Sequence, residues 1–313
     1  MKMIDAATLR RQLTYPALID ALDAAFCADV TVPVRHHHTV PVPGGSDATL
    51  LLMPAWTSGR HIGVKMVNVF PDNGARSLPS VMGVYLLFSG ETGAPLALMD
   101  GPMLTVRRTA AASALASRYL SRPDAATLAM VGTGALAPHL IEAHAAVRPL
   151  KKIILVGRSE DKACALRDSL PKMPGVSFEV TTDGEAAVAA ADIVSCATLS
   201  RDPVVKGDWL KPGAHLDLVG GFTPEMRETD DAAIRRASVF CDTRAGATKE
   251  AGDLVQPLAS GVLTQEAIRG DLFDLARKKV GGRRSADEIT LFKSVGTALE
   301  DLAAAELAVQ VSR

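Results

Sequence analysis

The stretch TLAMVGTGALAPHL, residues 127–140, decides the fold class of this chain. Its first residues form a short apolar run typical of a strand, and a helical pattern begins at Ala135. Between them stands the pattern G-x-G-x-x-A, made by Gly132, Gly134 and Ala137. In this context, with another strand about 20 residues further on, the pattern is typical of a mononucleotide-binding unit. An ordinary strand-to-helix turn is the alternative, and the context favours the nucleotide.

Short apolar strands alternate with Ala-rich helical stretches from Ala125 onwards, HLDLVGG (215–221) being one of the strands. Such alternation predicts parallel strands joined by right-handed crossovers. We therefore predict an α/β fold in which a Rossmann-type, doubly wound parallel sheet forms a dinucleotide-binding domain over residues 121–294. The flanking residues 1–120 and 295–313 are predicted to form a second, discontinuous α/β domain.

Bulk composition limits the classes of function. The chain has 313 residues, of which 48% are hydrophobic and 22% charged, which fits a globular protein with a sizeable core. Its net charge of -1 gives no general affinity for nucleic acid. No apolar run approaches the roughly 20 residues of a membrane span, and the N-terminus lacks a signal-type apolar core, so a cytoplasmic protein is expected. The four cysteines form no CxxC pair, which favours buried free thiols in a reducing compartment.

The end of the second predicted strand of the nucleotide unit indicates which cofactor binds. Proteins that use NAD usually carry an acidic residue at this place, but here the chain reads Gly157-Arg158-Ser159. Arg158 can pair with a 2′-phosphate, and Ser159 can donate a hydrogen bond to it. A charge-assisted contact of about 1.5–3 kcal/mol corresponds to roughly 10- to 150-fold in affinity. We therefore predict NADPH, with NADH as the other possibility; a solvated surface arginine is the alternative interpretation of Arg158.

Several separated blocks of the chain resemble the ornithine cyclodeaminase/μ-crystallin family. They include GVKMVNVFP (63–71), LTVRRTAAASALA (104–116), MVGTGALA (130–137) and VGGFTPEMRETD (219–230), and the resemblance covers nearly the whole length. It implies hydride chemistry at a carbon that bears both a nitrogen and a carboxylate. It also implies a homodimer, in which a substrate-binding and dimerisation domain is built from N-terminal segments and the C-terminal helix. We expect the helical tail, residues 288–311, to pack on the N-terminal region or on a second subunit.

Two cationic residues stand in otherwise weakly charged surroundings. Lys65 lies in a predicted strand, where a lysine is rarely buried without a partner, and Arg108 lies near the start of an Ala-rich helix. Arginine matches a carboxylate with two parallel hydrogen bonds. By the resemblance, both residues are catalytic and hold the substrate carboxylate, assisted by Arg35 and by the hydroxyl of Ser80. An interdomain salt bridge is the alternative for Arg108, and a surface charge is the alternative for Arg35.

The resemblance also places Ser294 and Gly296 at the nicotinamide end of the cofactor site. The complete set of cofactor-binding residues that we expect is Thr109, Gly132, Thr133, Gly134, Ala135, Arg158, Ser159, Ala197, Thr198, Val219, Gly220, Ser294 and Gly296.

No metal site is predicted. The run of His36, His37 and His38 is a poor candidate because neighbouring side chains on a strand point to opposite faces. Cys196 ends a predicted strand, and no histidine stands near it in the sequence to support a nucleophilic role. We therefore expect Cys196 to pack in the core or to contact the cofactor.

Phe222 marks a departure from the cyclodeaminases that this chain resembles, which carry an aspartate after the glycine pair. A phenylalanine cannot act as a base, and the loss of a positioned proton acceptor typically removes ~10²–10⁴ in rate. A preformed cyclic imine does not need that base, and an aromatic wall at a substrate site suits the methylene groups of its ring; packing in the core is the alternative for Phe222. Further along, Glu228 and Asp230 are expected to cap the next helix or face solvent.

The function predicted from these residues is NADPH-dependent reduction of a cyclic imino acid. The expected substrates are Δ1-pyrroline-2-carboxylate and the six-membered Δ1-piperideine-2-carboxylate, which give L-proline and L-pipecolate. The proton arrives with the imine or comes from Lys65 through water. The alternatives are an ornithine cyclodeaminase or alanine dehydrogenase-type oxidoreductase and, in another class, a non-catalytic NADPH-binding protein of the crystallin kind.

Overall fold

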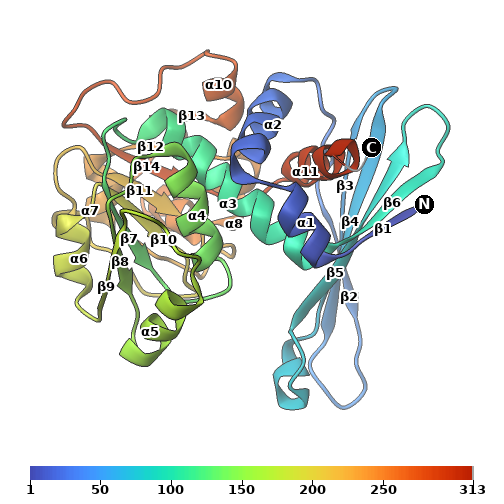
Figure 1. The fold of residues 1–313 in the computed structure, drawn as a ribbon, viewed down its shortest axis with the longest axis horizontal. Helices are drawn as coiled ribbons and strands as arrows, with labels where there is room; N and C mark the ends of the chain where they lie inside the picture. Colours follow the sequence, from blue (N-terminus) through green and yellow to red (C-terminus); the bar gives the residue numbers. More distant parts are fainter. Residues whose placement is uncertain (312–313) are drawn as a thin grey trace. The chain divides into compact units, whose positions relative to one another are not determined.

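The computed structural model describes residues 1–311 and divides the chain into two compact units (Figure 1). Unit 1 comprises Met1–Thr109 together with the C-terminal segment from Thr297, and unit 2 comprises Ala110–Gly296. The first division falls inside helix α3 (Gly101–Leu120), whereas the sequence prediction placed it at the end of that helix. Within the described residues, no helix has the length and apolar character needed to cross a membrane.

Unit 2 is built on an eight-stranded sheet in which every pair of neighbouring strands is parallel. The strand order is β13-β12-β14-β11-β10-β7-β8-β9, so the chain first builds outward from β7 to β9 and then crosses back to β10. This doubly wound order creates a switch point between β7 and β10, where open α/β sheets bind ligands. The predicted fold class is confirmed. The strands are β7 (Thr127–Val131), β8 (Lys152–Val156), β9 (Ser177–Thr181), β10 (Ile193–Cys196), β11 (His215–Leu218), β12 (Ala237–Cys241), β13 (Ile268–Asp271) and β14 (Ile289–Lys293).

The helices of unit 2 follow these strands as crossover connections. Between strands lie α4 (Ala137–Val147), α5 (Glu160–Ser169), α6 (Gly184–Ala190), η2 (Gly207–Trp209), α7 (Asp231–Arg236), α8 (Arg244–Glu250), α9 (Gly252–Ala259), η3 (Gln265–Ala267) and α10 (Leu272–Ala276). The strands are short and almost wholly apolar because helices cover the sheet, and their side chains form the core of the unit. The prediction of a continuous helix over 288–311 is wrong for its first part. Residues Ile289–Lys293 form β14, a central strand whose β-branched and aromatic residues suit a buried sheet.

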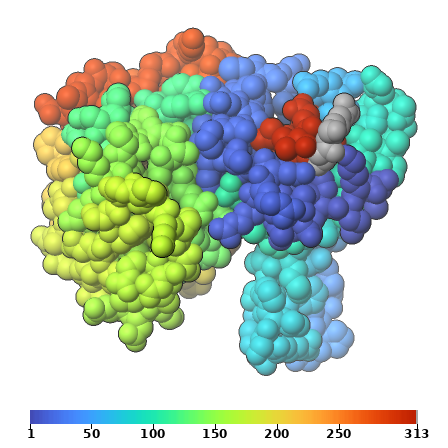
Figure 2. Space-filling view, viewed as in Figure 1, coloured from blue at the N-terminus to red at the C-terminus, as the bar shows by residue number. Residues whose placement is uncertain are grey.

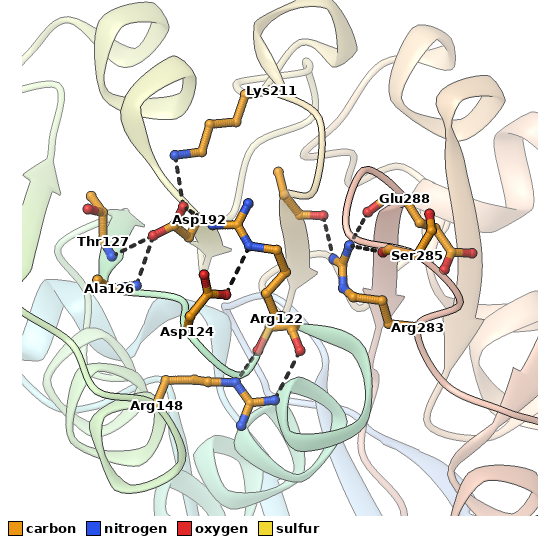
Figure 3. A network of polar contacts seen from close by, with 12 residues as sticks. Arg122, Asp124, Ala126, Thr127, Arg148, Asp192, Lys211, Arg283, Ser285 and Glu288 are labelled. Atoms are coloured by element: carbon orange, nitrogen blue, oxygen red, sulfur yellow. Dashed lines mark hydrogen bonds and ion pairs between the residues drawn. The ribbon is translucent and has the colours of Figure 1, made fainter.

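A polar network holds the amino-terminal end of β7 in this sheet (Figure 3). The Asp192 carboxylate accepts the backbone N–H groups of Ala126 and Thr127 at 2.8 and 3.0 Å. It also pairs with Arg122 at 2.9 Å and with Lys211 at 2.8 Å. These contacts hold the start of β7 in place, whereas the glycine motif follows the opposite, carboxyl end of the same strand.

Unit 1 is a six-stranded sheet with helices packed on it. Its order is β1-β6-β5-β4-β3-β2, with β1 parallel to β6 and all other pairs antiparallel. The C-terminal helix α11 contacts α2, β3 and β4, so the predicted packing of the tail on the N-terminal region is confirmed (Figure 1). The elements are β1 (Lys2–Ile4), α1 (Ala6–Gln12), α2 (Tyr15–Cys27), β2 (His36–Val40), β3 (Ala48–Thr57), β4 (His61–Val69), η1 (Pro71–Arg76), β5 (Val81–Ser89), β6 (Pro95–Asp100) and α11 (Ala298–Val311).

One end of this sheet is not covered by α1, α2 or α11. Figure 2 shows the light-blue and cyan end of the sheet, which includes η1, extending past these three helices. Every residue of β2 is exposed, and Val34, Val81 and Met82 are among the exposed large apolar residues. Unit 1 therefore carries an uncovered sheet surface that is partly apolar.

Candidate active site

The motif from Gly132 to Ala137 joins β7 to α4. Gly132 has a φ of 110°, and a Cβ atom there would lie 2.6 Å from the carbonyl oxygen of Ala197, so this turn requires glycine. Nothing lies within 4 Å of the place where a Cβ of Gly134 would stand. Helix α4 begins without a side-chain cap; the N–H of Ala137 donates to the carbonyl of Gly134 at 3.0 Å and Pro138 has no N–H, so a phosphate here would be bound by N–H groups of the preceding turn.

A cleft of about 580 Å³ opens at the carboxyl ends of β7, β8 and β10, a volume typical of small-molecule sites. Among the predicted cofactor residues, the cleft brings together Gly132, Thr133, Gly134, Arg158, Ala197 and Thr198. The sequence did not single out Trp209, which also lines the cleft. The lining of this cleft fits a dinucleotide, because the glycine turn and the carboxyl ends of three parallel strands face the same space.

Arg158 lies at the border of this cleft and a neighbouring cavity of about 350 Å³. Thr133, Ser159 and Lys162 also line that cavity. The Ser159 hydroxyl caps α5 by accepting the N–H of Lys162 at 3.5 Å. Lys162 was missed in the sequence; its place one turn after Arg158, at the start of a helix, was the available signal. Two cationic side chains therefore line one cavity beside the cleft.

The other predicted cofactor residues do not line the cleft. Val219 and Gly220 follow β11 and are buried, as are Ser294 and Gly296 after β14. Ala135 is exposed in the glycine motif. Thr109 is half-buried in α3 and belongs to unit 1.

Lys65 and Arg108 lie together in unit 1, in a buried cluster with two carboxylates of α11. The Lys65 ammonium is 2.8 and 3.0 Å from the two oxygens of Asp301. Arg108 donates through Nε to Asp301 at 3.0 Å and through Nη1 to Glu300 at 2.6 Å. The sequence analysis missed Glu300 and Asp301, although an adjacent pair of acids at the start of an otherwise apolar helix was a visible signal.

The electrostatics of this cluster make Lys65 unusual. Burial lowers the pKa of Lys65 to about 8; the charges of Arg108 and Arg35 act in the same direction, and Asp301 opposes them. Burial would raise the pKa of Asp301, but its pairing with Lys65 and Arg108 outweighs that and holds the pKa below its usual value. Asp301 is therefore an anion at neutral pH, and Lys65 can hold or release a proton near neutral pH.

The remaining predicted substrate residues have different surroundings. Arg35 is half-buried just before β2 and lies near enough to influence the charge on Lys65. Ser80 is exposed just before β5, and its carbonyl accepts the N–H of Phe70 at 2.8 Å. Phe222 belongs to unit 2 and its side chain is 51% exposed, so it does not pack in the core.

Two further expectations concern the histidine run and the cysteines. His36, His37 and His38 are exposed on β2, and among residues 1–311 no three His, Cys, Asp or Glu side chains are grouped to hold a metal ion. Cys196 is fully buried in the core, as expected, and burial raises the pKa of its thiol well above the usual value. The expected burial of the free thiols is wrong for Cys27, which is exposed.

The expectation for the acidic residues after Phe222 holds for one of them. Asp230 caps α7 by accepting the N–H of Ala233 at 3.0 Å. The prediction that Glu228 caps a helix or faces solvent is wrong, because its side chain is 0% exposed. It lies at the centre of a separate buried cluster in unit 2.

The chain belongs to the ornithine cyclodeaminase/mu-crystallin family, whose model matches residues 2–311, so the predicted family is confirmed. It is 39% identical over 313 residues to a Δ1-pyrroline-2-carboxylate reductase of Colwellia psychrerythraea, covering 99% of both chains. Among solved structures it is similar to the Δ1-pyrroline-2-carboxylate reductase of Thermococcus litoralis in complex with NADH and L-proline, with a TM-score of 0.92 and 31% identity over 100% of this chain and 97% of that one. An archaeal alanine dehydrogenase dimer with bound NAD gives a TM-score of 0.88 and 27% identity over 100% of this chain and 96% of that one.

Proposed function

We propose that the protein is an NAD(P)H-dependent oxidoreductase that reduces the C=N bond of cyclic imino acids. Its substrates are Δ1-pyrroline-2-carboxylate and Δ1-piperideine-2-carboxylate, and its products are L-proline and L-pipecolate. The observation that carries the proposal is the buried cluster of Lys65 and Arg108 in a chain that also has a dinucleotide cleft. The relatives named above support the same activity.

Lys65 and Arg108 offer N–H donors of the kind that bind a substrate carboxylate. The two cations are matched by two carboxylates, Glu300 and Asp301, which keep Lys65 and Arg108 ordered before any ligand arrives. Arg35 supplies a further positive charge nearby. We assign the substrate carboxylate to Lys65 and Arg108, with Arg35 and the hydroxyl of Ser80 as further contacts, and we assign Phe222 as the apolar wall beside the ring.

The reduction needs one hydride at the imine carbon and one proton at the nitrogen. The bound dihydronicotinamide supplies the hydride. Lys65 holds a proton that the nitrogen can accept directly or through water, unless the imine binds already protonated. A buried ammonium with a pKa of about 8 is a better acid than an ordinary lysine, and Asp301 keeps it oriented.

We assign NADPH as the preferred cofactor. Arg158, Ser159 and Lys162 line the cavity next to the cleft, which is the place for a 2′-phosphate at the end of the second strand. Of the remaining predicted cofactor residues, we retain Thr109, Ala135, Val219, Gly220, Ser294 and Gly296 as proposed neighbours of the cofactor.

We further propose a homodimer that acts in the cytoplasm without metal, nucleic acid or membrane. The similar alanine dehydrogenase is described as a dimer. The uncovered end of the sheet in unit 1, with exposed Val34, Val81 and Met82, provides apolar surface for a second copy.

The test is oxidation of NADPH and of NADH with the five-membered and six-membered imino acids, together with analysis of the product. Rapid oxidation that yields L-proline and L-pipecolate is expected. Release of ammonia and proline from ornithine without net cofactor consumption would establish a cyclodeaminase instead. Cofactor binding without turnover of any imine or of pyruvate plus ammonia would establish a binding protein.

A further inference from the structure

The buried carboxylate of Glu228, between β11 and α7, accepts hydrogen bonds from residues that follow two different strands. Its Oε1 accepts the N–H and the hydroxyl of Thr198 at 2.6 and 2.9 Å. Its Oε2 accepts the N–H groups of Gly220 and Gly221 at 2.7 and 3.3 Å. Thr198 follows β10 and the glycines follow β11, so one buried carboxylate joins the carboxyl ends of two adjacent strands.

The glycine pair is shaped by this carboxylate. A Cβ atom on Gly220 would stand 1.9 Å from the carbonyl oxygen of Thr198 and 2.6 Å from Oε1 of Glu228. A Cβ atom on Gly221 would stand 3.0 Å from the carboxylate of Asp253. The first position therefore excludes any side chain, and the second is tighter than ordinary contact. Both glycines allow the backbone to approach the buried acids.

Two further charged residues, Lys293 and Asp253, lie next to Glu228. Lys293, at the end of β14, lies 3.0 Å from Asp253 and 3.9 Å from Glu228, and all three side chains are fully buried. Asp253, on α9, accepts the backbone N–H groups of Glu228 and Thr229 at 2.7 and 3.1 Å. Burial raises the pKa of Glu228, and the charge of Asp253 adds to this, while Lys293 and the N–H of Thr198 oppose it. The hydrogen bonds to both carboxylate oxygens hold the acid in its place.

The strand end that Glu228 holds is a wall of the cleft. Thr198 lines the cleft directly. The preceding residue, Ala197, also lines it, and its carbonyl oxygen abuts the turn at Gly132. We infer that Glu228 is a positioning residue for the dinucleotide, which fixes Thr198 and Gly220 so that the cleft is already formed when the cofactor arrives. This inference rests on the proposed function of the cleft.

The decisive variant is Glu228→Gln, which keeps the size of the side chain but replaces one acceptor oxygen with an NH₂ group that faces N–H donors. The expected result is a rise in the KM and Kd for NADPH of roughly 10- to 100-fold, from the loss of charge-assisted hydrogen bonds. The KM for the imine at saturating NADPH should stay within about twofold. A purely structural role would not separate the two KM values in this way.

Binding can be followed without turnover, through energy transfer from Trp209 in the cleft to bound NADPH. The chain has two tryptophans, so a Trp56→Phe background leaves Trp209 as the sole donor. The matched control is Asp271→Asn, which removes a carboxylate that caps α10 by accepting the N–H of Asp274 at 3.0 Å and does not line the cleft. It should lower thermal stability and leave the Kd for NADPH unchanged.

Unchanged NADPH binding in folded Glu228→Gln would overturn the inference. If that variant does not fold, Glu228→Asp replaces it, since it keeps the charge beside Lys293 but is one methylene too short to reach both strands. Equal KM values for NADPH in the Asp variant and the parent protein would also overturn it. Failure of the parent protein to bind NADPH would instead refute the proposed function, so the two failures are distinguishable.

Discussion

Two buried lysines, Lys65 in unit 1 and Lys293 in unit 2, show how similar contacts give different chemistry. Each ammonium lies within 3.0 Å of an aspartate carboxylate and is almost completely shielded from solvent. Yet the pKa of Lys65 is lowered to about 8, whereas the pKa of Lys293 is raised.

The neighbouring charges explain the difference. Burial lowers the pKa of both lysines, and Arg108 and Arg35 lower that of Lys65 further, while its partner Asp301 is shared with Arg108. At Lys293, two carboxylates attract the same ammonium and outweigh burial. A buried lysine is therefore poised to exchange a proton where other cations crowd it, and is a fixed counter-ion where anions outnumber it.

The largest expected effect comes from replacing each lysine with methionine. Lys65→Met should lower kcat/KM for the imine by ~10²–10⁴ while the protein stays folded, because Asp301 keeps Arg108 as a partner. Lys293→Met should instead lower the free energy of unfolding by about 3–5 kcal/mol, since it leaves two buried carboxylates uncompensated. Steady-state kinetics and thermal unfolding of both variants measure the contrast. Near-normal turnover by Lys65→Met would remove this lysine from the mechanism.

The next effect is on the pH dependence of the reaction. If protonated Lys65 is needed, kcat/KM should fall as the pH rises through about 8, because the ammonium is then lost. Asp301→Asn removes the anion that raises the pKa of Lys65, so the descending limb should move to lower pH. At a fixed pH above this limb, kcat/KM of the variant should be about tenfold lower for each pH unit by which its limb is displaced. A limb at the same pH in both proteins would assign it to another group, such as the imine itself.

The sequence predicted unit 2 far better than it predicted either lysine cluster. The motif at Gly132 and Gly134 is local, so turn, strand and helix could be inferred from adjacent residues. Lys65 and Asp301 are 236 residues apart in the chain, and only the packing of α11 on β4 brings them together. Lys65 was found because a charge is conspicuous in an apolar strand, whereas its carboxylate partner was passed over although it stands in an acidic pair at the start of a largely apolar helix.

Glu228 was misjudged for a related reason. A run of acidic residues before a helix normally caps it, and Asp230 does so. Nothing local distinguishes Glu228, whose partners come from the ends of three other strands. The adjacent glycines at 220 and 221 were the relevant signal, because they show that the backbone is crowded there.

The smallest effect is expected from substitution of exposed cations. It compares the buried lysines with cations that are in contact with solvent. Arg158 and Lys162 are exposed and line the cavity proposed for the 2′-phosphate, where water and salt screen their charges. Arg158→Ala should lower the ratio of NADPH to NADH turnover by about tenfold, and Lys162→Ala by about two- to fivefold, with both effects shrinking as salt rises. The control is Arg167→Ala on α5, the helix that carries Lys162. It removes an exposed arginine paired with Asp168 and should leave the ratio unchanged. Equal ratios in Arg158→Ala and the parent protein would place the 2′-phosphate elsewhere, and would leave Lys65 as the one cation of this comparison with a functional consequence.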